Sequence, residues 1–351
     1  MMTDSGLAAL TPVTVLTGFL GSGKTTLLNA LLRDERLRDT AVIINEFGEV
    51  GLDHLLVSKA DENVVLLDSG CLCCSIGNGL SETLETLFRQ RSDSTIPAFK
   101  RVVVETTGLA DPFPLLKIVL NDYFVSKHFS INGVLTTVDA EHGIGQLRDH
   151  REARHQASAA SCVAITKTDI AAPDVVADLK GKVLALNEDA EVIPAYTTVG
   201  DQQKLSEELI ELVTRAAGHS FVSPPAPSLV KLPVPGQPSE GSLQPLKFQF
   251  AHDEQIQSFV FRWDRPVNWQ LYATWLGELQ SLPAADLMRT KGLLQLDGSG
   301  PPYVIQGVQH TFSKPLRMAD WPNADHRSWL VIIAKGIQRA ALEKILQPVN
   351  V

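Results

Sequence analysis

A phosphate-binding loop near the start of the chain is the clearest sign of chemistry in the sequence. Residues Gly18 to Thr25 match the pattern G-x-x-x-x-G-K-[ST], and they lie between an apolar strand and a helix, as such a loop requires. Glycines let successive backbone N–H groups turn toward phosphate oxygens, and the helix N-terminus adds positive potential. Lys24 is expected to neutralise the β- and γ-phosphates, and the Thr25 hydroxyl to bind Mg²⁺. The predicted nucleotide-binding residues of this loop are Gly18, Gly21, Ser22, Gly23, Lys24, Thr25 and Thr26.

A second nucleotide element follows the apolar residues 102–104. The segment ends at Glu105, and an acid after such a strand places a carboxylate near the Mg²⁺ of a phosphate loop. Because Glu is longer than the usual Asp, Glu105 could reach the metal through water or orient the attacking water. Gly108 could supply a backbone N–H to the γ-phosphate. An ordinary strand end is the alternative, but we predict that Lys24 and Glu105 serve catalysis.

A third element predicts recognition of guanine. The strand Val163–Thr166 is followed by Lys167 and, two residues later, by Asp169. An Asp carboxylate here can accept from guanine N1–H and from the exocyclic amine, whereas adenine has no donor at either place. The stem of Lys167 can lie along the base. The usual first residue of this pattern is Asn, and Thr166 in its place makes the guanine signal weaker.

Three cysteines crowd into four residues after the predicted strand Val64–Leu67. The thiols of Cys71, Cys73 and Cys74 can converge on one soft or borderline metal such as Zn²⁺. Three ligands do not close a tetrahedron, so the cluster favours an open site from which the ion can exchange. A redox thiol pair and a set of buried, inert cysteines are the alternatives. Cys162 stands alone at the start of a strand and is expected in the core.

An acidic segment lies between the phosphate loop and the cysteines. Asn45–Asp53 follows a strand and contains three acids and two glycines, at the place where a P-loop GTPase keeps a switch that responds to γ-phosphate and Mg²⁺. Glu46, Glu49 or Asp53 could bind metal or orient water, and Glu46 is, with Glu105, a candidate for orienting the attacking water. A solvated acidic turn is the alternative.

Composition fits a globular protein with more than one domain. The 351 residues are enough for about two domains. Hydrophobic residues at 44% and charged residues at 20% exclude a mostly disordered chain, a collagen-like chain and a coiled coil. The net charge of −9 makes the chain a poor non-specific binder of nucleic acid or of an anionic membrane.

The sequence also indicates the cellular compartment of the protein. No apolar run approaches the roughly 18 residues of a membrane-spanning helix. The first residues show no basic segment followed by an apolar core, so a secretion signal is not expected. Four cysteines, three of them within four residues, cannot staple a chain of this length, so we expect the reducing cytoplasm.

Apolar strands alternate with amphipathic helices through about residue 217. The strands lack clean polar alternation, which is typical of strands buried on both faces, and we predict a doubly wound, mainly parallel α/β sheet. The predicted strands are Val13–Leu16, Ala41–Ile44, Val64–Leu67, Val102–Val104, Gly133–Val138, Val163–Thr166 and Glu191–Ala195. The predicted helices are Lys24–Arg33, Leu80–Arg91, Phe113–Leu120, Gly145–Ser158, Asp174–Leu186 and Lys204–Ala217.

A proline-rich stretch separates this part from a smaller C-terminal α+β domain. Residues 219–245 hold seven prolines among serines and glycines, so they predict a semi-rigid linker. Residues 246–351 follow as the second unit. Its predicted strands and helices are Gln257–Trp263, Asn268–Leu279 (helix), Leu293–Leu296, Tyr303–Val308, Trp329–Ala334 and Gly336–Leu346 (helix). Its tryptophans are expected to pack in a core, and they are Trp263, Trp269, Trp275 and Trp329.

Taken together, five motifs resemble one family. In this chain they are Gly18–Thr26, Asn45–Glu49, Gly70–Cys74, Glu105–Pro112 and Thr166–Asp169. In this order they look like the motifs of the CobW-type metallochaperone GTPases, the group that includes zinc chaperones and YjiA-like proteins. The resemblance extends over the whole chain. It assigns residues 1–218 to a GTPase domain and, through Phe261-Arg262, Arg265-Pro266 and Arg289–Gly292, residues 246–351 to the C-terminal domain of the family.

The resemblance implies GTP-dependent handling of a transition metal. The expected cargo is Zn²⁺, or Co²⁺ or a similar ion, delivered to client metalloproteins. Cys71, Cys73 and Cys74 then bind the metal, and Glu46 is an extra ligand. The implied reaction is GTP and water to GDP and phosphate with Mg²⁺, slow until a partner or metal completes the site. GTP binding and metal binding are expected to be coupled, and self-association of the chain stays open.

Two other classes of function remain as alternatives. A P-loop kinase acting on a small molecule would use the same loop, but it would not explain the cysteine triplet. A redox-sensing binding module would instead form a disulfide between Cys71 and Cys73 or Cys74.

Overall fold

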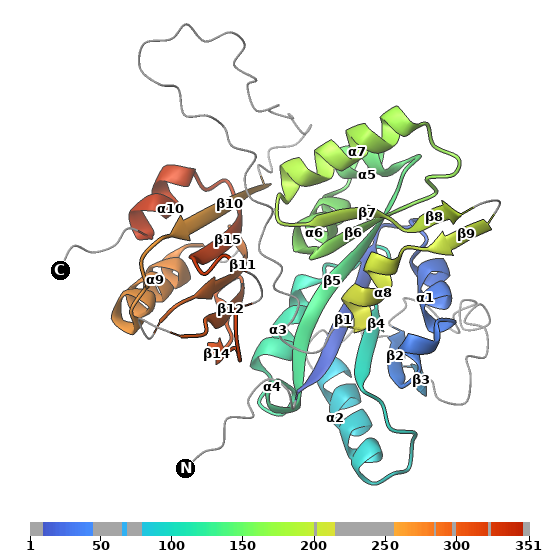
Figure 1. Cartoon of the computed structure of the whole chain (residues 1–351), viewed down its shortest axis with the longest axis horizontal. Coiled ribbons are helices and arrows are strands. Elements are labelled where there is room, and N and C mark those ends of the chain that lie inside the picture. The colour runs from blue at the N-terminus through green and yellow to red at the C-terminus, as the bar shows by residue number, and fades with distance from the viewer. Residues whose placement is uncertain are drawn as a thin grey trace, which may run out of the picture.

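Two sheets organise the part of the chain that the structure describes. The computed structural model describes residues 10–44, 65–68 (as backbone), 79–199, 202–214, 256–283, 286–296, 300–321 and 324–346. The larger sheet with its helices comes from the N-terminal residues, and the smaller sheet from residues after 255, beside it in Figure 1. None of the described helices is long and apolar enough to cross a lipid bilayer.

Seven described strands form the larger sheet. Their order is β3-β2-β4-β1-β5-β6-β7, and each pairing is parallel. The strands are β1 (Thr11–Gly18), β2 (Thr40–Ile44), β3 (Val65–Asp68), β4 (Arg101–Glu105), β5 (Phe129–Asp139), β6 (Cys162–Thr166) and β7 (Glu191–Pro194). This confirms the predicted parallel sheet.

Helices cover both faces of this sheet. One face packs against α1 (Lys24–Leu32) and α8 (Glu207–Thr214), beside a short 3₁₀ turn at Glu35–Leu37. The other face carries the remaining helices, namely α2 (Gly79–Ser92), α3 (Phe113–Asn121), α4 (Val125–His128), α5 (Gly143–Asp149), α6 (Arg151–Ala159) and α7 (Pro173–Leu186). A small hairpin of β8 (Tyr196–Val199) and β9 (Gln202–Leu205) extends from the edge.

Strand β1 shows why its sequence lacks polar alternation. All eight of its residues are buried. Leu16 packs in the cluster with α1 and α8, while Val13 and Val15 point to the opposite face. Because successive side chains of a strand alternate, a strand covered on both faces needs apolar residues at every position. The predicted core position of Cys162 at the start of β6 is confirmed, since its side chain is fully buried.

The C-terminal residues form an antiparallel sheet with helices on its outer face. The main strand order is β10-β15-β11-β12-β13, and β14 pairs with β12. The strands are β10 (Ile256–Trp263), β11 (Leu287–Leu294), β12 (Tyr303–Val308), β13 (Thr311–Phe312), β14 (Leu316–Arg317) and β15 (Ser328–Lys335). Helices α9 (Trp269–Ser281) and α10 (Arg339–Ile345) lie on the side away from the larger sheet, as Figure 1 shows. This confirms the predicted α+β character.

Both faces of the smaller sheet are buried. Residues such as Phe261 and Ile332 pack with α9 and α10. Their neighbours Trp329, Val331 and Ile333 join the same apolar cluster as residues of α3, α6 and α7. The two sheets therefore share one continuous core. Trp275 and Trp329 are buried as predicted, whereas the prediction for Trp269 is wrong, because 43% of that residue is exposed.

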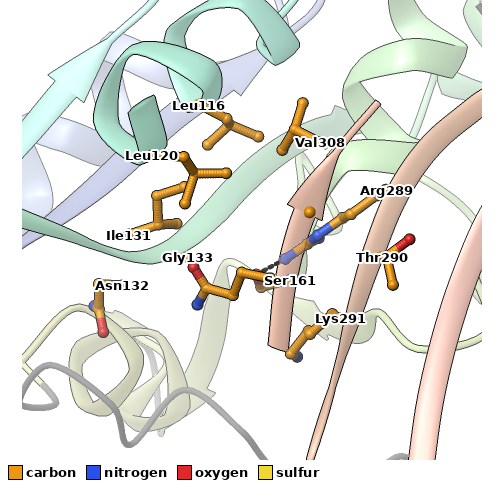
Figure 2. A pocket seen from close by; sticks show the side chains of 12 residues that line it. Leu116, Leu120, Ile131, Asn132, Gly133, Ser161, Arg289, Thr290, Lys291 and Val308 are labelled. Atoms are coloured by element: carbon orange, nitrogen blue, oxygen red, sulfur yellow. Dashed lines mark hydrogen bonds between the residues drawn. The ribbon is translucent and has the colours of Figure 1, made fainter. Parts of the chain in front are cut away.

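Charged residues of β11 anchor the C-terminal sheet to the N-terminal one. Arg289 donates to the carbonyls of Ala159 and Ala160 and, at 3.1 Å, to the hydroxyl of Ser161, as Figure 2 shows for the last contact. Two residues on, Lys291 lies 3.4 Å from the buried carboxylate of Asp189. Burial lowers the pKa of Lys291, and the charge of Asp189 opposes that shift.

The predicted helix Gly145–Ser158 is wrong as one element. The structure has α5 and α6 instead, separated by His150, whose backbone is extended with φ −117° and ψ 123°. Arg154 donates to the carbonyls of Leu147 and Arg148 and so satisfies the end of α5. His150 stacks on Phe19, with ring centroids 4.5 Å apart. Tertiary contacts, rather than a local breaker residue, set this break.

Several other boundaries differ from the predictions, among them the start of β5, which lies at Phe129 rather than Gly133. Two of the differences have a clear structural cause. Residues predicted to begin a helix at Lys204 instead complete β9, and α8 begins at Glu207 after Ser206, whose N–H donates to the carbonyl of Ala195. In β11 the strand begins at Leu287 rather than Leu293. Its polar residues made that segment look unlike a strand, but they find their partners at the contact between the two sheets.

The proposed domain limits stay predictions. The linker 219–245 lies outside the described residues, and so do the boundaries at 218 and 246.

A glycine on β11 provides a test of this packing. A Cβ at Gly292 would lie 2.1 Å from the carbonyl oxygen of Trp329 on the neighbouring strand. We expect Gly292→Ala to lower the free energy of unfolding by about 3 kcal/mol, because the strands must separate. Gly277→Ala is the control, since nothing lies within 4 Å of that position on α9, and it should stabilise by about 1 kcal/mol. Urea titration measures both, and equal stability of the two variants would contradict the expectation.

Candidate functional site

The phosphate loop joins β1 to α1 at the carboxyl edge of the larger sheet. Gly18 has φ +145°, and a Cβ there would lie 2.2 Å from the hydroxyl of Thr137 on β5. Gly23, the residue before α1, has φ +88°. Only glycine adopts both backbone conformations without strain. The two glycines therefore let the loop pass from β1 to α1 while it lies close against β5.

Ser22 holds this loop to two strands at once. Its buried hydroxyl lies 2.6 Å from that of Thr137, and its carbonyl accepts from the hydroxyl of Thr166 at 2.8 Å. Thr166, the departure from the usual Asn, therefore joins the predicted base-binding segment to the phosphate loop. The structure brings these two predicted elements together.

Lys24 and Thr25 begin α1 beside the loop. The Nζ of Lys24 donates to the carbonyl of Phe19 at 3.2 Å, so its ammonium group reaches across the loop. The hydroxyl of Thr25 donates to Oε1 of Glu105 at 2.7 Å. Thr26 is exposed on the next position. A hydroxyl and a carboxylate are the hard oxygen donors that Mg²⁺ prefers, so this pair fits the predicted ion.

Glu105 reaches Thr25 because β4 is the neighbour of β1. The register pairs Glu105 with Leu16, two residues before the loop begins. Glu105 is 3% exposed. A carboxylate that is buried to this degree normally has a charged or hydrogen-bonding partner, which Thr25 supplies here. The assignment of this pair to Mg²⁺ and to catalysis stays a prediction.

The base-binding segment follows β6. Lys167 has φ +56°, an uncommon conformation outside glycine, and its Nζ donates to Oδ2 of Asp139 at 2.6 Å. Asp169 is exposed two residues later, and it follows a strand parallel to β1, so it lies at the same carboxyl edge of the sheet as the phosphate loop. This arrangement leaves the Asp169 carboxylate accessible to a base, as the guanine prediction requires.

Asp139 is a site residue that the sequence analysis missed. It ends β5 and pairs in register with Thr166. Besides Lys167, its carboxylate accepts from the N–H groups of Glu141 and His142. Burial alone would raise the pKa of Asp139, but these hydrogen bonds, with that of Lys167 the largest, outweigh burial and hold the pKa below its ordinary value. An acid at the end of an apolar strand was the available signal, and it was the same signal that identified Glu105.

Asp139, Glu141 and His142 also form the one group of three metal-capable side chains within the described ranges. The Asp139 carboxylate already accepts from Lys167 and from two backbone N–H groups. Its partners account for its position, so we assign no metal to this group.

The predicted transition-metal ligands lie outside the described residues. They are Glu46, Cys71, Cys73 and Cys74. The acidic segment Asn45–Asp53 lies outside as well. The backbones that lead into both segments are described, since β2 ends at Ile44 and β3 ends at Asp68.

Comparison with known sequences matches both parts of the chain. Residues 12–194 match the family described as "CobW/HypB/UreG, nucleotide-binding domain". Residues 256–349 match "Cobalamin synthesis protein cobW C-terminal domain".

Characterised relatives match over nearly the full chain. The zinc chaperone YjiA of Escherichia coli is 31% identical over 332 residues, which cover 93% of this chain and 94% of that protein. The zinc-regulated GTPase metalloprotein activator 1 of Saccharomyces cerevisiae is 27% identical over 372 residues, which cover 96% of this chain and 82% of that protein. Among solved structures, that of the Zn(II)-bound YjiA GTPase from E. coli superposes with a TM-score of 0.64 and 26% identity, covering 97% of this chain and 99% of that one.

The ion pair at the end of β5 gives a test that depends on pH. A carboxylate whose pKa is lower in the folded than in the unfolded chain adds stability above the unfolded value, and that stability is lost as the pH falls through the folded pKa. We expect Asp139→Asn to lower the free energy of unfolding by about 1–3 kcal/mol at neutral pH. The difference from the unaltered chain should shrink below about pH 4. Urea titrations across this range measure it, and a difference independent of pH would contradict the role of the charge.

Proposed function

The chain belongs to the CobW/HypB/UreG family of nucleotide-binding proteins, and from that premise we propose that it is a GTP-hydrolysing metallochaperone for Zn²⁺. Gly18, Ser22, Lys24 and Thr25 bind the phosphates, and the residues after β6 bind guanine. The cysteine triplet after β3 binds the cargo ion. The zinc chaperone and the zinc-regulated activator among the relatives support the choice of ion.

One observation carries this proposal, and it is the shared register at the edge of the sheet. Glu105 on β4 pairs with Ile44 at the end of β2, and Ile44 pairs with Asp68 at the end of β3. Neighbouring strands lie about 4.8 Å apart, so the backbones of Glu105 and Asp68 are on the order of 10 Å apart. The segments that follow β2 and β3 thus start beside the carboxylate that faces Thr25.

Chain length limits how far the metal ligands can lie from the nucleotide. Cys71 is three residues beyond Asp68, and Glu46 is two residues beyond Ile44. Three residues span at most about 10 Å when extended. This reach is consistent with thiols close to the nucleotide, and it supports coupling between the two ligands.

The chain's own residues account for binding and orientation in the hydrolysis reaction. Lys24 places a positive charge on the β- and γ-phosphates, where charge builds up during transfer. Thr25 and Glu105 would hold Mg²⁺, which neutralises phosphate oxygens when bound. Glu105 and Glu46 orient the attacking water in this proposal. The expected intrinsic turnover is slow, because the chain supplies no evident strong base.

Coupling between GTP binding and Zn²⁺ binding gives hydrolysis its purpose in this proposal. If GTP changes the affinity for Zn²⁺, then Zn²⁺ must change the affinity for GTP by the same factor. The acidic segment after β2 is the proposed link, because it starts between the strand that bears Glu105 and the strand that precedes the cysteines. Client metalloproteins in the reducing cytoplasm are the proposed receivers of the ion.

The central test measures Zn²⁺ affinity in the presence of GDP and of a non-hydrolysable GTP analogue. Coupling energies in allosteric proteins correspond to about 5- to 150-fold changes in affinity, and we expect a change in that range. Competition with a chromogenic chelator gives the affinity. Identical Zn²⁺ affinities with the two nucleotides would overturn the coupling.

Matched cysteine variants separate the metal site from general effects of thiol loss. Cys73→Ala should weaken Zn²⁺ binding and leave GTP binding intact. Cys162→Ala is the control, because that thiol is fully buried in the core of the sheet and should keep normal Zn²⁺ affinity. Loss of GTP binding and Zn²⁺ binding together in Cys73→Ala would mean that the triplet is structural.

Lys24→Ala should abolish GTP turnover.

A further inference from the structure

We propose that Gln156 on α6 is a positioning residue for GTP hydrolysis, acting by fixing the backbone of Gly108 beside the phosphate loop. This inference rests on the proposed function, since it takes Gly108 as the donor of an N–H to the γ-phosphate. Gln156 itself contacts neither nucleotide nor water in this proposal.

The backbone of Gly108 lies directly against the phosphate loop. A Cβ at this glycine would lie 2.8 Å from the backbone nitrogen of Leu20 and 2.9 Å from its Cα. No other residue type fits there unless the loop moves. Gly108 is thus the point where the segment after β4 meets the loop, and a shift of its backbone would alter the loop.

Gln156 holds the turn at Gly108 by two hydrogen bonds. It is fully buried, and its Nε2 donates to the carbonyl of Gly108 at 3.1 Å and to that of Ala110 at 3.0 Å. The orientation of the amide follows from these contacts, because the flipped side chain would set its own oxygen against two carbonyl oxygens. One side-chain amide therefore bridges two carbonyls of the same turn.

The two peptide planes around Gly108 are held by different groups. The carbonyl of Thr107 shares its plane with the N–H of Gly108, and it accepts from the N–H of Ala110 at 3.1 Å and from the hydroxyl of Thr106 at 3.2 Å. The carbonyl of Gly108 accepts from Gln156. Removing the Gln156 amide would free the carbonyls of Gly108 and Ala110 together. Because the N–H of Ala110 holds the carbonyl of Thr107, a looser Ala110 would let the plane that carries the Gly108 N–H tilt.

The preceding residue on α6, His155, fixes the far end of the same segment. The ring of His155 lies 3.1 Å from Oδ2 of Asp111, whose other oxygen accepts from the N–H of Phe113 at the start of α3. Burial alone would raise the pKa of Asp111, but the contacts with His155 and the Phe113 N–H outweigh it and lower the pKa. Two adjacent residues of α6 thus hold both ends of the turn.

Helix α6 is a firm base for these contacts. The backbone carbonyl of Gln156 accepts from the hydroxyl of Thr136 on β5 at 2.9 Å. Asn187 donates to three carbonyls at the end of the helix. Arg289 of β11 donates to the carbonyls of Ala159 and Ala160 at the same end. A side chain on a helix fixed at several points can impose its geometry on a turn, whereas the reverse would require the helix to move.

The test is Gln156→Met, which keeps the length of the side chain and removes its donor without burying a charge. We expect kcat for GTP hydrolysis to fall about tenfold, the effect of losing two neutral hydrogen bonds that position a transition-state contact. The affinity for GDP should be unchanged, because GDP makes no contact through a γ-phosphate. Steady-state phosphate release and binding of a fluorescent GDP measure the two quantities.

Ser158→Ala is the control for loosening of the helix. Ser158 is fully buried on α6, and its hydroxyl donates to the carbonyl of Arg154 one turn earlier. Its hydroxyl bonds within α6 rather than to the turn at Gly108, so the variant should keep normal kcat. A loss in Ser158→Ala equal to that in Gln156→Met would assign the effect to the helix and overturn the proposal.

Gln156→Glu provides a second variant with a readout in pH. A buried carboxylate facing two carbonyl oxygens is repelled, and its pKa rises. Once protonated, it can donate to one carbonyl, so kcat relative to the unaltered chain should recover as the pH falls from about 8 to about 6. A ratio that does not change with pH, or a folded Gln156→Met with normal kcat, overturns the positioning role. The proposed function fails separately, if the unaltered chain releases no phosphate from GTP.

Discussion

Parallel pairing of the strands is the constraint on which this site depends. In a parallel sheet the carboxyl ends of neighbouring strands meet at one edge, so residues far apart in sequence are brought together there. The register places Glu105 beside the end of β1 and Asp139 beside Thr166. Strand order alone therefore makes neighbours of the phosphate loop, Glu105 and the base-binding segment, whether or not a nucleotide is bound. Apolar residues on both faces of each strand hold that register.

The sequence predicts those features whose signal is local. The phosphate loop and the acid at Glu105 have fixed spacings relative to strands, and the predicted strands are confirmed. The break at His150 was not predictable, because it depends on contacts made on folding: Phe19 of the phosphate loop stacks on His150, and Arg154 of the next helix turns back onto the end of α5. The importance of Asp139 and Gln156 depends on partners that only the folded chain supplies. The cysteine triplet lies outside the described residues, so its role rests on spacing and on family membership.

The C-terminal domain is part of the same architecture rather than an appendage. Its sheet buries one face on α9 and α10 and the other on the N-terminal helices. Arg289 donates to backbone carbonyls at the junction of α6 and β6. Helix α6 also holds Gly108 through Gln156, and β6 ends at Thr166, which donates to Ser22 of the phosphate loop. The C-terminal sheet therefore packs on the same helix and strand that position Gly108 and Thr166.

Ser22 has a consequence for how the pocket treats its ligands. With its hydroxyl on β5 and its carbonyl on β6, the phosphate loop is already rigid, so an arriving nucleotide loses little conformational entropy to order it. A preorganised loop would bind GDP and GTP about equally well. In the proposed function, discrimination between the two nucleotides then falls to the turn after β4, where Gly108 lies against the loop.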